Sequence, residues 1–146
     1  MRRKWVGAAL ALGAAVLLVG CGSDGRTVVK GKLVEKDKPF TIDLSNAKAG
    51  PGGKGVPPGT RPLVMAFHPA EGGDQIGADV DAATGTFEVR GGDGRGLKPG
   101  RYKISLGGPP GAADPFNGKF SREKTQIVRD VNLGEEIVID VSKPQG

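Results

Sequence analysis

The residues of this chain that could do chemistry are few and lie far apart in the sequence. The 146 residues include one Cys, Cys21, and one His, His68. A single thiol cannot close an intramolecular disulfide, and one Cys with one His cannot build a zinc site of several Cys and His ligands. Ser105, Ser121 and Ser142 lack the Gly-x-Ser-x-Gly elbow and the partners of a catalytic triad. The sequence therefore predicts a protein that is not an enzyme, binds no cofactor and holds no metal.

Three other polar features have simpler interpretations than ligand binding. His68 stands beside Pro69 at the end of an apolar run, and we expect a solvated residue at a strand edge. Asp79 and Asp81 could offer oxygen ligands to Ca²⁺, but EF-hand spacing is absent, so we expect turn-forming hydrogen bonds. The Gly-rich stretch 91–96 lacks the Lys-Ser/Thr pair of a phosphate-binding loop and is expected to be a plain loop.

The charge of the chain does not indicate a nucleic-acid partner. The formal net charge is +5, but three of the 21 basic residues are Arg2, Arg3 and Lys4. Without them, 18 basic and 16 acidic residues leave only +2, too little for a strong electrostatic footprint. Five later basic residues could touch anionic polymers or lipid headgroups, although we expect ordinary solvated strand residues: Arg101, Lys103, Lys119, Arg122 and Lys124.

The N-terminal segment has the pattern of a secretory signal. A basic stretch over residues 1–5 is followed by residues 6–20, which contain no charge and no Pro. Fifteen helical residues span about 22 Å, which is shorter than the bilayer core of about 30 Å. The pattern therefore predicts a signal peptide over residues 1–20 rather than a membrane-spanning helix.

The end of this segment, Leu18-Val19-Gly20-Cys21, resembles the lipobox of bacterial lipoproteins. The resemblance implies that the Cys21 thiol receives a diacylglycerol and that cleavage before it makes Cys21 the new N-terminus. Two or three acyl chains on one residue would hold the protein permanently on a membrane. We therefore expect a protein of the cell envelope, anchored to a membrane through lipid on Cys21 and facing the periplasm or the cell exterior.

The rest of the chain has the period-2 alternation of short, half-buried strands. Segments of this kind cover residues 27–34, 40–44, 63–68, 75–80, 86–90, 101–106, 126–131 and 135–141. The last two are expected to form a hairpin around Asn132-Leu133-Gly134. No segment has a convincing helical period, so the predicted fold is all-β, a single seven- to eight-stranded antiparallel β-sandwich.

Two connections between the predicted strands are unusually long. Residues 45–62 contain five Gly and four Pro, and we expect a mobile insertion. Residues 107–124 contain Phe116 and Phe120 among polar residues. We expect this second loop to pack back on the sandwich.

Three motifs in the strand region resemble one family of domains. They are Val29-x-Gly31-x-Leu33, Thr84-Gly85-Thr86-Phe87-Glu88-Val89 and Pro99-Gly100-Arg101-Tyr102. Together they look like a transthyretin-like, carboxypeptidase-regulatory-like β-sandwich. The resemblance implies a positive φ at Gly85 and a buried Tyr102 ring whose hydroxyl reaches the backbone, as in tyrosine corners. None of these residues carries chemistry.

These patterns predict a signal peptide over residues 1–20, a lipidated tether over 21–26, a β-sandwich over 27–142 and a tail over 143–146. The expected function is that of a non-catalytic envelope lipoprotein, structural, adhesive or accessory, which binds an envelope protein or polysaccharide. The alternative is a weak saccharide- or peptide-binding module that contacts its ligand through Phe116, Lys119 and Phe120. Exposure of both aromatic rings would favour ligand binding, and burial of both would favour the structural role.

Overall fold

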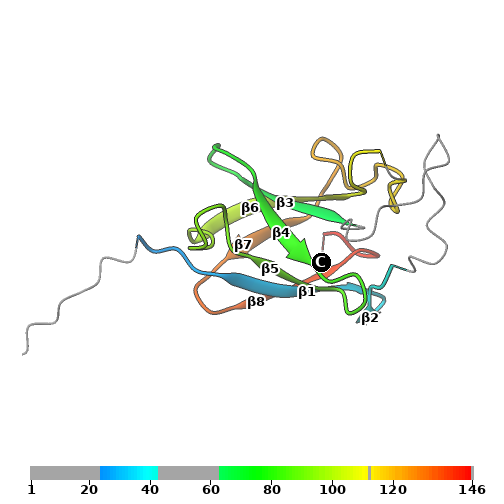
Figure 1. Cartoon of the computed structure of the whole chain (residues 1–146), viewed down its shortest axis with the longest axis horizontal. Helices are drawn as coiled ribbons and strands as arrows, with labels where there is room; N and C mark the ends of the chain where they lie inside the picture. The colour runs from blue at the N-terminus through cyan, green and yellow to red at the C-terminus, as the bar shows by residue number, and fades with distance from the viewer. Residues whose placement is uncertain (1–23, 43–62, 112, 146) are drawn as a thin grey trace, which may run out of the picture.

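The structure is a computed structural model that describes residues 24–42, 63–111 and 113–145, and these residues contain strands and turns but no helix (Figure 1). The eight strands are β1 (Val29–Glu35), β2 (Lys38–Pro39), β3 (Val64–Pro69), β4 (Ile76–Val80), β5 (Thr86–Val89), β6 (Gly100–Gly107), β7 (Val128–Val131) and β8 (Glu136–Asp140). The predicted all-β class is confirmed.

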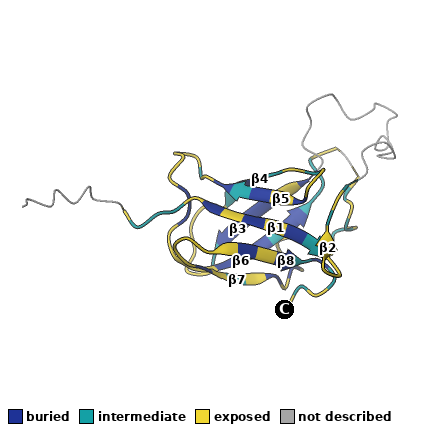
Figure 2. Ribbon diagram, turned by 90° about the horizontal axis from the view of Figure 1, so that it is seen from below, coloured by how far each residue is buried: buried dark blue, intermediate teal, exposed yellow. Residues whose placement is uncertain are grey.

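The strands form one curled sheet in the order β2-β1-β5-β4-β3-β6-β7, and β8 pairs with β1 off this path. The sheet is continuous because β4 pairs with both β3 and β5. Every pairing is antiparallel except that of β1 with β8, which is parallel. Buried and exposed residues alternate along β1 and β8, so one face of each strand lines the interior (Figure 2).

The predicted final hairpin is wrong. β7 pairs with β6, whereas β8 lies beside β1, so the chain reverses at residues 132–135 without pairing the two strands that flank this turn. The reason is tertiary, because Ile137 and Ile139 become buried in the core beside β1. A turn signal fixes where the chain reverses, but long-range packing decides which strand becomes the neighbour.

The second predicted strand, residues 40–44, is also displaced. Only Lys38–Pro39 pairs with the end of β1, across a tight turn. Phe40 and Ile42 pack against the core without joining the sheet, although the Phe40 N–H donates to the Leu33 carbonyl over 2.9 Å. Residues 43–44 and the predicted insertion over 45–62 lie outside the described residues.

The core follows the alternation of the sequence. Along β6, Tyr102, Ile104 and Leu106 are buried while the residues between them face outward. The rings of Phe67 and Phe87 have centroids 6.1 Å apart, and the Tyr102 ring lies edge-on to Phe67 at the same distance. Such aromatic pairs contribute beyond the area they bury.

Both structural expectations attached to the family resemblance are confirmed. Tyr102 is buried, and its hydroxyl donates to the Lys98 carbonyl over 2.9 Å. Gly85 has φ 72°, and a Cβ there would lie 2.5 Å from the Phe40 carbonyl oxygen. Gly85 permits a tight turn, and the Tyr102 hydroxyl ties the backbone at Lys98 to the core.

The loops gather at two opposite ends of the sheet (Figure 1). The entry end comprises residues 24–28 and the loops 70–75, 90–99 and 132–135, next to the starts of β1, β4, β6 and β8. The far end comprises residues 36–37, 81–85 and 141–145 and the described residues of the loop 108–127, which are 108–111 and 113–127.

The parallel pairing of β1 with β8 predicts the effect of substituting Gly31. A Cβ at Gly31 would overlap the Ile137 carbonyl oxygen and the Phe87 ring, so backbone or ring must shift. Gly31→Ala should therefore lower the free energy of unfolding by about 1–3 kcal/mol or more, as overpacked cores do. Urea unfolding of the purified variant measures this change.

Gly77→Ala is the matched control, because Gly77 is also in a strand but has no atom within 4 Å of the added Cβ. It should leave stability unchanged or raise it by up to about 1 kcal/mol. Equal effects of the two substitutions would show that β8 does not lie against β1.

Candidate functional site

The predicted lipidation site lies outside the described residues. This holds for Cys21 and for the lipobox residues Leu18, Val19 and Gly20, so lipid attachment stays a prediction. The described chain begins at Asp24, three residues after Cys21. Residues 24–28 lead from this point into β1.

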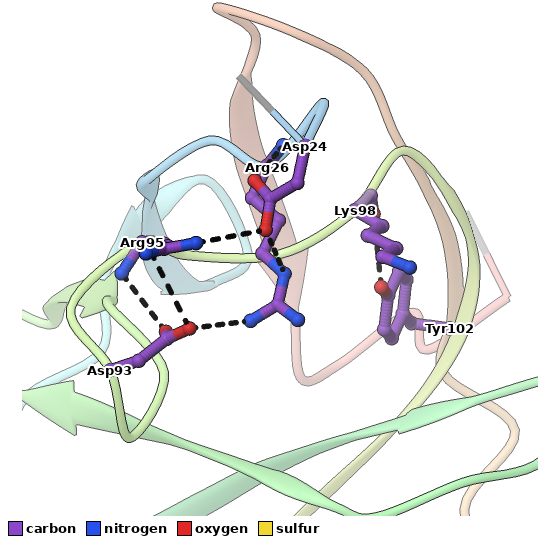
Figure 3. A network of polar contacts seen from close by, with 6 residues as sticks. All are labelled: Asp24, Arg26, Asp93, Arg95, Lys98 and Tyr102. Carbon is purple, nitrogen blue, oxygen red and sulfur yellow. Dashed lines mark hydrogen bonds and ion pairs between the residues drawn. The ribbon is translucent and has the colours of Figure 1, made fainter. Parts of the chain in front are cut away.

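A network of charges fastens this segment to the loop 90–99 (Figure 3). The Arg26 guanidinium donates to the Asp93 carboxylate over 2.8 Å, and its Nε lies 3.0 Å from Asp24. The Arg95 guanidinium lies 3.5 Å from the same Asp24 carboxylate. Exposed pairs of this kind contribute little singly, but here four side chains share one network.

Backbone hydrogen bonds support the same junction. Thr27 and Leu97 each donate an N–H to the carbonyl of the other, both over 2.8 Å. Gly96, with φ 85°, allows this approach because a Cβ there would overlap the Thr27 carbonyl. The pKa of Asp93 is lowered, first by the hydrogen bond from the Arg95 N–H and further by the Arg26 charge. The Gly-rich stretch 91–96 is a loop, as expected, and it binds the described residues 26 and 27 that lead into β1.

The aromatic loop at the far end packs onto the sheet, as expected. Phe120 is buried at 2% exposure, and Phe116 is half-buried. Phe116 stacks on Phe40 at 5.3 Å between centroids and meets Phe120 edge-on at 5.0 Å. The Lys119 ammonium lies 5.0 Å from the centroid of the Phe120 ring.

Local hydrogen bonds hold this loop in place. The Asp114 carboxylate accepts from the Phe116 N–H over 2.9 Å and from the Gly118 N–H over 2.6 Å. Buried Thr125 donates its hydroxyl to the Ile104 carbonyl over 2.7 Å. Because the loop is already held at both ends, it loses little conformational entropy when it binds a partner.

The arrangement leaves fewer side chains accessible to a small ligand than the sequence predicted. The Phe120 ring belongs to the core, so Phe116 and Lys119 are the candidate contacts that remain accessible. The hollow beside Lys119 and Pro144 measures about 220 Å³. Ligand pockets typically measure about 300–1,000 Å³.

The expectation for His68 is wrong, because it is 7% exposed rather than solvated. It lies on β3, between β4 and β6, and its Nε2 is 2.9 Å from the Ser105 hydroxyl oxygen. Its Nδ1 is buried with no hydrogen-bond partner in the described part of the chain. The pair therefore lacks the carboxylate that orients a catalytic histidine. Ala66, two residues earlier, is apolar and buried on the same face, a signal that this face is covered.

Burial lowers the pKa of His68, and the charges of Arg122 and Lys103 lower it further, against a smaller opposite effect of Glu123. The imidazole is therefore neutral at pH 7.

Of the two candidate calcium ligands, Asp81 serves a turn, whereas the turn expected at Asp79 is wrong because Asp79 lies within β4, opposite Glu88. The Asp81 carboxylate accepts from the N–H groups of Ala83 and Thr84 over 2.8 and 3.3 Å, as expected. In the described ranges, no group of three or more His, Cys, Asp or Glu side chains could hold a metal ion. The same ranges contain no helix long and apolar enough to cross a bilayer.

Comparison with known proteins gave no match to any family model, curated protein or solved structure.

The burial of His68 predicts a pH dependence of stability. Native His68 binds a proton less readily than in the unfolded chain, where the pKa of His is about 6.5. The free energy of unfolding should therefore be fully developed above pH about 6.5 and fall as the pH decreases below it. Urea unfolding at pH 7.5 and pH 5 measures the difference.

His68→Gln, which cannot titrate, is the control for this experiment. It should lose less stability than the original chain between the two pH values. The same loss in both proteins would assign the acid sensitivity to other groups.

Proposed function

We propose that this protein is a non-catalytic lipoprotein of the cell envelope, secreted by a signal peptide over residues 1–20 and anchored by lipid on Cys21. One observation carries the proposal: the lipobox-like run Leu18-Val19-Gly20-Cys21 follows a basic stretch and an uncharged apolar segment. The structure adds that Arg26, five residues after Cys21, contacts both Asp24 and Asp93. A tether fixed so close to its lipid would hold the domain at the membrane surface.

We further propose that the curled sheet is a transthyretin-like β-sandwich. The Tyr102 hydroxyl bound to the Lys98 carbonyl and the tight turn at Gly85 support this assignment. On this fold the chemistry-bearing residues are few, and the domain acts through its surface.

The proposed role is structural, adhesive or accessory, with an envelope protein or polysaccharide bound at the far end. Two features support this choice of end. The loop 108–127 lies opposite the point where the tether enters (Figure 1). Its aromatic side chains hold it rigidly on the core, so it presents a preformed surface. Phe120 is buried but Phe116 is only half-buried, so one of the two rings is lost to the alternative, a saccharide or peptide module that would now use Phe116 and Lys119.

The proposed anchor predicts the behaviour of a serine variant. Cys21 is the only thiol of the chain, so Cys21→Ser removes the only acceptor for lipid. The variant should remain an unprocessed precursor or a soluble protein, whereas Ser23→Ala should be processed normally. Detergent-phase partitioning of cell extracts measures both. Full membrane partitioning of Cys21→Ser would refute the lipid anchor.

The proposed partner surface predicts where crosslinks form in cells. A photo-crosslinking residue at exposed Lys119, on the far-end loop, should capture an envelope protein or polysaccharide. The same group at Lys32, which is exposed in the middle of β1, is the matched control and should capture much less. Equal capture from both positions, or none from Lys119, would contradict binding at the far end.

A further inference from the structure

The tether limits how far the domain can stand from its proposed lipid. Asp24 follows Cys21 by three residues, which reach at most about 11 Å when fully extended. Asp24 and Arg26 are held against the loop 90–99 by the charge network. Because both the length and the attachment point are fixed, the entry end of the domain must lie next to the lipid headgroups. This step rests on the proposed anchor at Cys21.

The entry end exposes an apolar tip. Leu133 lies in the turn 132–135 and is 63% exposed, the highest value among the large hydrophobic residues of the described ranges. The turn follows Val131, which pairs with Gly100, and precedes Glu136, which pairs with Lys30. These pairings place the turn 132–135 beyond the strand ends, on the side where the chain enters (Figure 1).

The entry end also has a hollow of about 520 Å³ between the loops 70–75 and 96–102. Its lining carries basic side chains, including Lys98 and Arg101, and the acidic side chains of Glu71 and Asp74. The Lys98 ammonium forms no ion pair with another described residue. A lining with both signs of charge suits a zwitterionic headgroup, which also carries one charge of each sign.

We propose that the entry end is a membrane-contacting surface, in which Leu133 inserts at headgroup depth and zwitterionic phospholipid headgroups meet the hollow at the same end of the domain. The occupant of this surface is the bilayer that holds the Cys21 lipid. The contact gives the domain one orientation, with the far end directed away from the membrane.

The test places a fluorescent probe on the lipid-anchored full chain in phosphatidylcholine vesicles that contain a spin-labelled lipid quencher. Since lipid occupies the sulfur of Cys21, a thiol introduced by Leu133→Cys is the one that reacts with the probe. Its fluorescence should fall at least about twofold, because interfacial groups lie about 5–10 Å deep. Ala83→Cys, on an exposed far-end turn, is the matched control and should show little quenching.

The outcomes separate this inference from the proposed function. A chain that partitions with the vesicles but shows equal quenching at the two positions overturns the membrane contact while leaving the anchor intact. Quenching at position 133 that requires an added anionic lipid, phosphatidylglycerol, overturns the assignment to zwitterionic headgroups. A chain that carries no lipid and stays in solution refutes the anchor itself, and the inference with it.

Discussion

The close approach of β8 to β1 at Gly31 is the contact on which the rest of the sheet depends. β1 has β5 along one edge and β8 along the other. Because position 31 has no side chain, the ring of Phe87 and the backbone at Ile137 both reach the space beside it. The same contact brings Ile139 into the core and sends the turn 132–135 to the entry end. Gly31 thus permits both the packing of Ile139 in the core and the position of the turn 132–135 at the entry end.

Most strand positions could be predicted from the sequence, with the segment 40–44 as the exception, but strand partners could not. Period-2 alternation identified which residues of β6 face inward, because the pleat alone sets that pattern. The same alternation identified β7 and β8. The turn signal between them, however, led to the wrong prediction that these two strands pair with each other. Their actual partners, β6 and β1, are chosen by which apolar faces can be buried together, and this depends on residues far away in the chain.

The candidate sites show the same division. The burial of Tyr102 and the turn at Asp81 follow from local chemistry and were predicted. The ion pair of Arg26 with Asp93 joins residues far apart in the chain, and no local pattern marks it. His68 was misjudged because a histidine beside a proline resembles a strand end, whereas β3 is covered on both faces. Burial on the second face of a strand depends on which segments cross over it, so sequence alternation shows it only weakly.

The parallel pair also has a kinetic consequence. Lys30 at the start of the sheet pairs with Glu136 near the end of the chain, so more than a hundred residues must be enclosed before β1 gains its second neighbour. Closing a loop of that length costs entropy before any contact compensates for it, and such non-local topologies fold slowly. During synthesis, β1 therefore cannot pair with β8 until β8 has been made. On the proposed secretion route, this delay would keep the chain unfolded while it threads through the translocation channel, and the sheet would close only after its final strand arrives on the far side.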